Sequence, residues 1–282
     1  MLRLIFSAAF ALSSVNGAVI TYNADGANGA AIQATIDQFR ADLGGANNGV
    51  GGTFATGRRE INWDAVPDSF SQPNFLPGNF FNSNSARGVV MTPLNGGTGF
   101  FTSADASNPT TTPALFASLG TGYGTEFQTF SAERLFTVLG SNQLQVEFFV
   151  PGTLTAAGVS GFGAVFADVD LTGNSSGIQA FDAQGNSIGF NAAIRESSGL
   201  SFTGIRVDGA TPLISRVVIT VGNTALGGSD PDISNGAFDV VVLDDFIYGE
   251  PQAAAAAGVP EPSAFALSAL GLAVAAFRFR RR

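Results

Sequence analysis

Hydrophobic residues recur along the chain at two periods, and each period predicts a different kind of element. Over residues 30–43, Ile32, Ile36, Phe39 and Leu43 follow one another at spacings of four, three and four residues, which places them on one stripe of an amphipathic helix. A glycine pair ends this segment. From residue 143 onwards, short apolar runs recur at spacings of roughly 10 to 20 residues between Gly, Asn, Asp and Ser turns, a pattern typical of β-strands.

The apolar runs predict a protein that is mainly β. The strands expected in the second half are 144–150, 162–169, 178–181, 187–190, 201–207, 214–221 and 238–248, and those expected earlier are 88–91, 99–102 and 126–138. The stretch IQAFDAQGNSIGF, 178–190, predicts a hairpin. Many strands with few helices favour two packed antiparallel sheets, so we expect a jelly-roll-like antiparallel β-sandwich with a short N-terminal helix.

Composition divides the chain into one body and three other segments. The body is expected over 19–249, with its helix near 30–43 and a loop-rich stretch over 53–85, where Pro67, Pro73 and Pro77 interrupt any long strand. Residues 250–258 contain five consecutive alanines and no bulky apolar side chain, so we interpret them as a linker.

Both ends of the chain have the composition of targeting segments. Residues 1–18 begin with Arg3, continue with nine apolar residues and end in small residues, which predicts a signal peptide. Near the other end, residues 264–277 are uncharged and as a helix would span about 21 Å, against a hydrocarbon core of about 30 Å. Counting from Val259 gives 19 residues, and we predict a single transmembrane helix near 263–279.

The last 24 residues, 259–282, combine three features in a fixed order. Val259, Pro260, Glu261, Pro262 and Ser263 come first, the apolar segment follows, and the chain closes on the arginines Arg278, Arg280, Arg281 and Arg282. This order resembles the PEP-CTERM protein-sorting signal of Gram-negative bacteria. The arginines would stop translocation and stay on the cytoplasmic side, leaving the body outside. The alternative is an ordinary C-terminal anchor that is never cut.

The resemblance implies a processing route. An exosortase in the inner membrane would recognise Pro260, Glu261 and Pro262 while the helix holds the chain transiently in the bilayer. Cleavage would release the body to the cell surface or to an exopolysaccharide matrix. The body, with REINWD, FSAERLFT, VSGFGAVFADVD and VVLDDFIYGEP, also resembles an uncharacterised group of PEP-CTERM proteins. That second resemblance carries over no catalytic residues.

The charged residues narrow the chemistry that the body can perform. The chain contains no Cys and no His, and all 13 basic residues are Arg, which excludes thiolate nucleophiles, histidine bases, Cys/His zinc sites and lysine Schiff bases. Five of the arginines lie in the terminal segments, so the body carries a net charge near −13. An acidic body repels nucleic acid, so we expect none as a partner and favour calcium or uncharged sugar.

Two adjacent carboxylates near the C-terminus of the body are the candidate site. Asp244 and Asp245 lie in the apolar run 238–248, where strand alternation would turn them to opposite faces and prevent them from flanking one glycosidic bond together. A buried unpaired carboxylate is costly, so one of them needs a partner. We predict a structural calcium held by Asp64 with Asp244 or Asp245, as in jelly-roll carbohydrate-binding modules; an arginine partner or a solvated strand end is the alternative.

Three weaker motifs favour structural roles. The loop 168–177 begins like a calcium-binding loop but has Gln179 where the bidentate Glu should stand, so a turn is the better interpretation, and 230–236 is interpreted in the same way. The aromatic residues Trp63, Tyr22, Tyr123 and Tyr248 could stack on sugar rings, although core packing is the favoured role.

These observations predict an exported, non-enzymatic surface or extracellular-matrix protein, sorted through its C-terminal signal, that adheres to polysaccharide or to other matrix proteins. The alternative is an extracellular carbohydrate-active hydrolase, since paired carboxylates need no His, Cys or Lys. Such a hydrolase should present two carboxyl groups about 5 to 10 Å apart in a cleft.

Overall fold

The computed structural model describes residues 17–120, 122–173, 175–209, 214–227 and 238–254. The helices are α1 (Gly29–Asp42), α2 (Phe80–Ser83) and α3 (Tyr123–Glu126), with 3-10 turns at Trp63–Ala65 and Asp68–Phe70. The strands are β1 (Val19–Gly26), β2 (Arg58–Ile61), β3 (Val89–Pro93), β4 (Gly99–Thr102), β5 (Phe136–Leu139), β6 (Gln143–Phe148), β7 (Ala157–Gly158), β8 (Gly161–Val169), β9 (Gly177–Phe181), β10 (Ser187–Ala192), β11 (Glu196–Val207), β12 (Arg216–Thr220), β13 (Val242–Gly249) and β14 (Gln252–Ala253).

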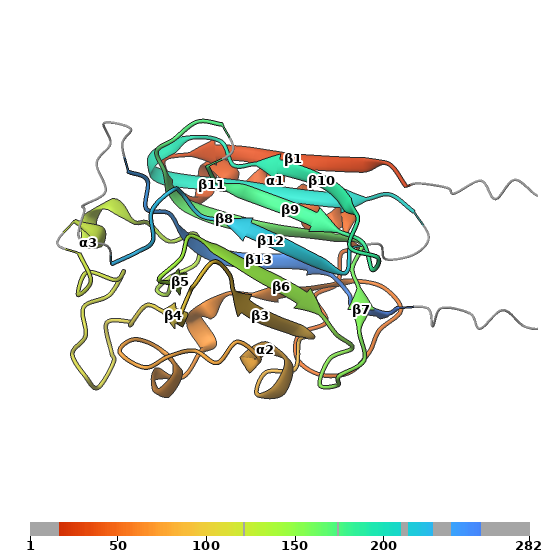
Figure 1. Ribbon diagram of the computed structural model, residues 1–282, viewed down its shortest axis with the longest axis horizontal. Coiled ribbons are helices and arrows are strands. Elements are labelled where there is room, and N and C mark those ends of the chain that lie inside the picture. The colour runs from red at the N-terminus through yellow and green to blue at the C-terminus, as the bar shows by residue number, and fades with distance from the viewer. Residues whose placement is uncertain (1–16, 121, 174, 210–213, 228–237, 255–282) are drawn as a thin grey trace, which may run out of the picture.

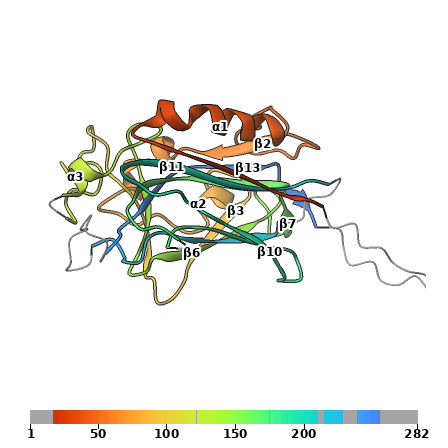
Figure 2. The ribbon, with the colours of Figure 1, turned by 90° about the horizontal axis from the view of Figure 1, so that it is seen from above.

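The strands form two antiparallel sheets that pack face to face (Figure 1). The larger sheet has the order β1-β11-β8-β13-β5-β4, with β2 also paired to β13, and the smaller has the order β10-β9-β12-β6-β3. Figure 2 shows a third layer, in which α1 covers the outer face of the larger sheet while β6 and β10 lie on the other side. The mainly β, antiparallel fold class is therefore confirmed, whereas the jelly-roll topology stays a prediction.

The three layers enclose two apolar cores. The core between the sheets includes Trp63, Phe136 and Phe246, and the core under α1 holds Ile36, Phe39 and other residues of the predicted stripe. Because both faces of the larger sheet are covered, β8 and β13 are buried along their whole length. The α1 helix begins at Asn28, whose side chain accepts a 3.1 Å hydrogen bond from the backbone N–H of Ala30.

Most expected elements are present, and the differences concern short or interrupted strands. The predicted hairpin is formed by β9 and β10, which pair directly. The long strand expected over 126–138 is replaced by α3, an irregular turn and the short β5, and the strand expected over 238–248 starts only at Val242. Strands β1, β2, β7 and β14 were not expected.

The body extends further toward the C-terminus than the sequence suggested. The linker expected over 250–258 is wrong in its first part, because Glu250 is buried and β14 pairs with β7. The described body begins at Gly17 and ends at Ala254, and the strands next to these two ends, β1 and β14, both reach the β7 end of the sandwich (Figure 1).

Among the described residues, no helix is both long and apolar enough to cross a membrane. The transmembrane helix predicted near 263–279 and all but the last two residues of the signal peptide predicted over 1–18 lie outside the described residues.

Candidate functional site

Asp244 and Asp245 both reach the same serine, which corrects the expectation that they face opposite ways. The Ser131 hydroxyl lies 2.7 Å from Asp245 Oδ1 and 3.4 Å from Asp244 Oδ1. The cause is a β-bulge: β13 advances three residues from Leu243 to Phe246 while its partner β8 advances only two. A bulge inserts one extra residue and re-aims the side chains around it, so simple alternation fails here.

The buried pair favours a shared proton. Burial raises the pKa of Asp244 well above its ordinary value, and the negative charge of Asp245 raises it further. Burial also raises the pKa of Asp245, to about 6, against the opposing hydrogen bond from Ser131. The two carboxyls hydrogen-bond each other, and because both pKa values are raised, the pair favours a proton that belongs to the pair rather than to either residue. The backbone N–H of Phe130 donates to Asp244 Oδ2 over 2.6 Å.

Asp64 joins this pair through the turn before β5. The backbone N–H of Arg134 donates to Asp64 Oδ1 over 3.0 Å, and the negative charge of Asp64 contributes to the raised pKa of Asp244. The three predicted calcium ligands are thus neighbours around the 130–134 turn. Among the described residues, however, no group of three acidic side chains is arranged to hold a metal ion, so calcium at Asp64, Asp244 and Asp245 stays a prediction.

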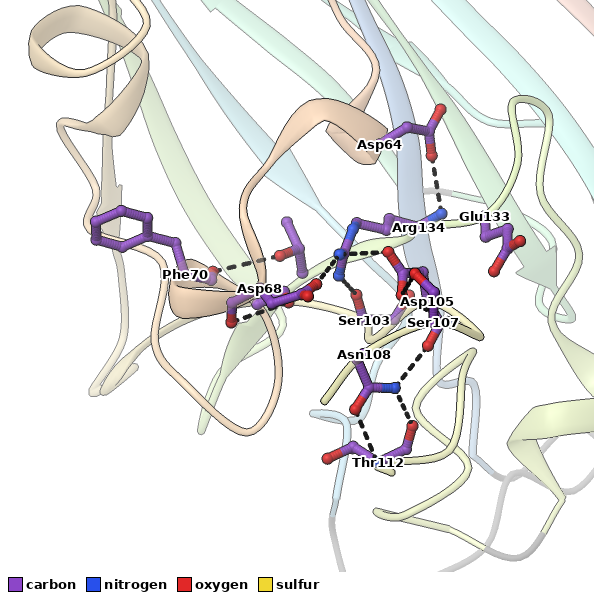
Figure 3. A network of polar contacts seen from close by, with 12 residues as sticks. Asp64, Asp68, Phe70, Ser103, Asp105, Ser107, Asn108, Thr112, Glu133 and Arg134 are labelled. Atoms are coloured by element: carbon purple, nitrogen blue, oxygen red, sulfur yellow. Dashed lines mark hydrogen bonds and ion pairs between the residues drawn. The ribbon is translucent and has the colours of Figure 1, made fainter. Parts of the chain in front are cut away.

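Arg134 anchors a second polar network that sequence reasoning missed (Figure 3). Its Nη2 lies 2.5 Å from Asp68 Oδ1 and 2.6 Å from Asp105 Oδ2, and its Nη1 donates to the Ser103 carbonyl over 2.9 Å. Asn108 continues the network, donating to the carbonyls of Asp105 and Thr112. Arg134 is only 3% exposed and lies between two carboxylates, so this network ties the surrounding loops together.

The weaker motifs have structural partners. Asp168 accepts a 2.6 Å hydrogen bond from the backbone N–H of Ser198 in β11, and Asp239 accepts bonds from the backbone at 170–171. These bonds hold the loop 168–177 against β11 and against the segment before β13. Trp63, Tyr123 and Tyr248 are buried. The Tyr22 hydroxyl donates to Asp42 over 2.7 Å. The segment 230–236 lies outside the described residues.

A cavity of about 220 Å³ lies beside Trp63, between the loop-rich segment and α2. Its lining residues are Asn62, Trp63, Ala65, Val66, Pro67, Phe80, Phe81, Asn84, Ser85 and Arg87. Trp63 is fixed by stacking on Phe136, with ring centroids 4.1 Å apart and planes 5° from parallel. Arg87 lies over the ring of Phe81, with its guanidinium carbon 5.8 Å from the ring centroid. The lining therefore combines aromatic surface with amides and a single charged group.

Two donors in this lining lack an acceptor. Trp63 Nε1 and Arg87 Nε are buried and have no hydrogen-bond partner among the described residues. Arg87 donates through Nη1 to the Ser85 hydroxyl, and its backbone carbonyl accepts a 3.0 Å bond from the Tyr248 hydroxyl on β13. Burial lowers the pKa of Arg87, and the positive charge of Arg59 adds to this effect. A buried N–H without an acceptor is costly. Of the two residues only Arg87 is partly exposed, so its guanidinium is the group that a ligand in the cavity can reach.

Comparison with known families gives one match. Residues 258–282 match the PEP-CTERM protein-sorting motif. The chain carries a PEP-CTERM sorting signal. This confirms the resemblance of the C-terminal residues to that signal, whereas the resemblance of the body to a group of PEP-CTERM proteins stays a prediction. The motif indicates an exported protein that is processed by an exosortase and sent through the membrane toward the cell surface. Comparisons with curated proteins and with solved structures find no match.

The PEP-CTERM motif contains all the residues predicted to direct processing. They are Val259, Pro260, Glu261, Pro262 and Ser263, followed by Arg278, Arg280, Arg281 and Arg282, and all lie outside the described residues. Pro260 is six residues beyond Ala254, the last described residue, so an extended chain could separate the two by at most about 20 Å.

The residues that sequence reasoning missed gave weak signals. Arg134 stands in FSAERLFT as an ordinary charged residue ahead of a strand, and its partners Asp68 and Asp105 are 66 and 29 residues away. Arg87 follows a polar stretch, NSNSA, that looks like a simple loop.

Proposed function

We propose that the chain is an exported, non-enzymatic protein whose body is released by exosortase processing to the cell surface or extracellular matrix, where it adheres to polysaccharide. The observation that carries the proposal is the PEP-CTERM motif at 258–282, which begins four residues after the last described residue of the body.

The closure of the body at its C-terminal end supports release by cleavage. Arg59 Nε and Nη2 each lie 2.7 Å from one oxygen of Glu250, and both side chains are fully buried or nearly so. Pairing of β14 with β7 adds a second attachment just beyond Glu250. A cut within or after the motif would leave both attachments in the released body, so cleavage should not unfold it.

The state of the described carboxylates supports a non-enzymatic role. Asp244 and Asp245 are 0% and 3% exposed, so no sugar can reach them. Asp68 and Asp105 are each held by the Arg134 guanidinium. A glycosidase needs one protonated and one ionised carboxyl group facing its substrate. The carbohydrate-active hydrolase remains the alternative function, and zymography of the processed protein on polysaccharide gels tests it, with a cleared zone favouring the hydrolase.

Cell fractionation of the native host tests the sorting route. The wild-type protein should reach the surface or matrix without Arg278 to Arg282, as measured by mass spectrometry of its C-terminus. A variant combining Pro260→Ala, Glu261→Ala and Pro262→Ala should remain full-length in the inner membrane. The matched control changes Ala255 and Ala256 to Ser, just before the motif, and should be processed like the wild type.

Two results would contradict the route. Full-length wild-type protein in the inner membrane would favour the uncut anchor, and full-length protein soluble in the cytoplasm would remove export altogether. Adhesion is measured separately, as cosedimentation of the processed protein with the host's extracellular polysaccharide.

A further inference from the structure

The Trp63 cavity is unusual in this acidic protein because its only charged lining residue is an arginine. Two other cavities of the described body carry acids. One, of about 350 Å³, is lined in part by Asp42 and Glu250, and another, of about 410 Å³, is lined in part by Glu147, Asp182 and Arg216. An anion would be repelled from those two cavities and attracted to the first.

Arg87 is free to bind a negatively charged ligand. The other arginines in its part of the fold are already paired, Arg59 with Glu250 and Arg134 with Asp68 and Asp105. Arg87 forms no ion pair with any described residue, and its Nε has no acceptor. An arginine fork matches a carboxylate in shape and charge.

The remaining lining residues indicate the class of molecule that carries this carboxylate. Phe80 and Phe81 supply aromatic surface, on which the apolar face of a sugar ring can pack, and Asn62 and Asn84 can donate to or accept from its hydroxyls. The volume of about 220 Å³ is below the range of about 300 to 1,000 Å³ typical for drug-sized ligands, which suits a single sugar unit.

We propose that the Trp63–Arg87 cavity binds the carboxylate of an acidic sugar unit, a uronate, within a polysaccharide. This inference rests on the proposed function, because it names the class of polysaccharide to which the exported body adheres. Arg87 supplies the cation, Asn62 and Asn84 supply neutral donors, and the ring of the sugar lies against the phenylalanines. Uncharged sugar, which the sequence favoured as a partner, then binds more weakly than the carboxylated form.

The test compares two ligands that differ only in charge. Full-length protein in mild detergent is titrated with an oligogalacturonate and with the methyl ester of the same oligosaccharide, in a calorimeter at low salt. The wild type should bind the free acid at least about tenfold more tightly than the ester, because the ester removes the charge-assisted hydrogen bonds. Arg87→Gln should abolish this preference, and Arg87→Lys should retain only part of it.

The matched control is Arg216→Gln. Arg216 is also half-buried, lies over an aromatic ring, Phe181, at 3.8 Å, and lines another cavity. This variant should bind oligogalacturonate within about twofold of the wild type. Thermal unfolding of each variant shows whether the fold is intact, and for a variant that does not fold, the wild-type preference for acid over ester still decides.

The outcomes separate the inference from the proposed function. Equal binding of acid and ester by the wild type, or an unchanged preference in Arg87→Gln, overturns the uronate site while leaving polysaccharide adhesion intact. Binding of an oligoglutamate as tightly as the oligosaccharide overturns the sugar assignment. If the protein binds neither oligosaccharide nor the host's own polysaccharide, adhesion fails together with the inference, although the sorting route stands.

Discussion

Arg59 lies close enough to Arg87 for its positive charge to lower the pKa of Arg87, yet the two side chains have different surroundings. Arg59 is completely buried, forms a two-pronged ion pair with Glu250 and donates to the carbonyls of Gly49, Gly51 and Gly52. Arg87 is half-buried and has one unpartnered N–H.

The difference indicates which arginine is structural. A fully buried cation is tolerated only when its charge and its donors are all matched, so Arg59 and Glu250 organise the 49–54 loop and close the C-terminal end of the body. A half-buried cation with an unfilled donor can exist because water still reaches part of it, and it retains the capacity to bind something else. Substitutions at the two sites should therefore act on different properties, the first on stability and the second on binding.

The largest effect is expected from Glu250→Gln, which breaks the buried pair. Gln can keep some hydrogen bonds but leaves the Arg59 charge uncompensated at a site with no exposure, which typically costs about 3–5 kcal/mol in the free energy of unfolding. Urea denaturation measures it. Asp208→Asn is the control, because the pair of Asp208 with Arg206 is solvent-exposed and should contribute under about 1 kcal/mol. A similar small loss of unfolding free energy in both variants would show that burial does not make the Arg59–Glu250 pair more important for stability than an exposed pair.

Glu250 also shows where sequence reasoning reached its limit. The helix over 30–43 and the main strands were predictable because periodicity is a local signal, carried by residues a few positions apart. The role of Glu250 depends on Arg59, 191 positions earlier, and the alanine-rich segment that follows gave the appearance of a linker. Long-range partners leave no mark in local composition.

The candidate site was predictable in its residues but not in its geometry. Asp244 and Asp245 were singled out because buried acids in apolar runs need partners, and Asp64 was added by analogy with the calcium sites of jelly-roll carbohydrate-binding modules. The structure brings the three together around the 130–134 turn. Alternation gave the wrong faces for the two adjacent acids, because the β-bulge after Leu243 depends on pairing with β8. The same long-range dependence hid Ser131 as the group that links them.

A smaller effect on stability is expected at Asp244. There the buried negative charge is compensated by a proton, whereas the buried charge of Glu250 is compensated by Arg59. The pKa of Asp244 and that of Asp245 are both raised in the folded protein, so this pair stabilises the fold fully at acid pH, and the contribution is lost as the pH rises through about 6 and above. Asp244→Asn mimics the protonated form. It should be more stable than the wild type by about 1–3 kcal/mol at pH 8 and equal to it near pH 4, measured by urea denaturation.

Asp42→Asn gives a control of opposite sign. Hydrogen bonds from Gln38 and Tyr22 lower the pKa of the exposed Asp42, so its small contribution to the stability of the fold is present above the unfolded pKa and lost as the pH falls.

Calcium gives a second test of the acidic pair, and the denaturation series of both variants are repeated in chelator and in calcium. If calcium bound at Asp64, Asp244 and Asp245, it would neutralise the pair and remove the wild-type decline at high pH. A decline that persists in calcium argues for the shared proton.

The smallest effect on stability is expected from Arg87→Gln. This change removes a cation that has no carboxylate partner and an N–H that has no acceptor, so little stabilisation is lost and some desolvation cost is relieved. The free energy of unfolding should stay within about 0.5 kcal/mol of the wild type. A loss as large as that of Glu250→Gln would mean that Arg87 is a structural arginine like Arg59. An unchanged stability together with loss of the acid-over-ester preference separates the two arginines completely, because Arg87 then acts on the ligand while Arg59 acts on the fold.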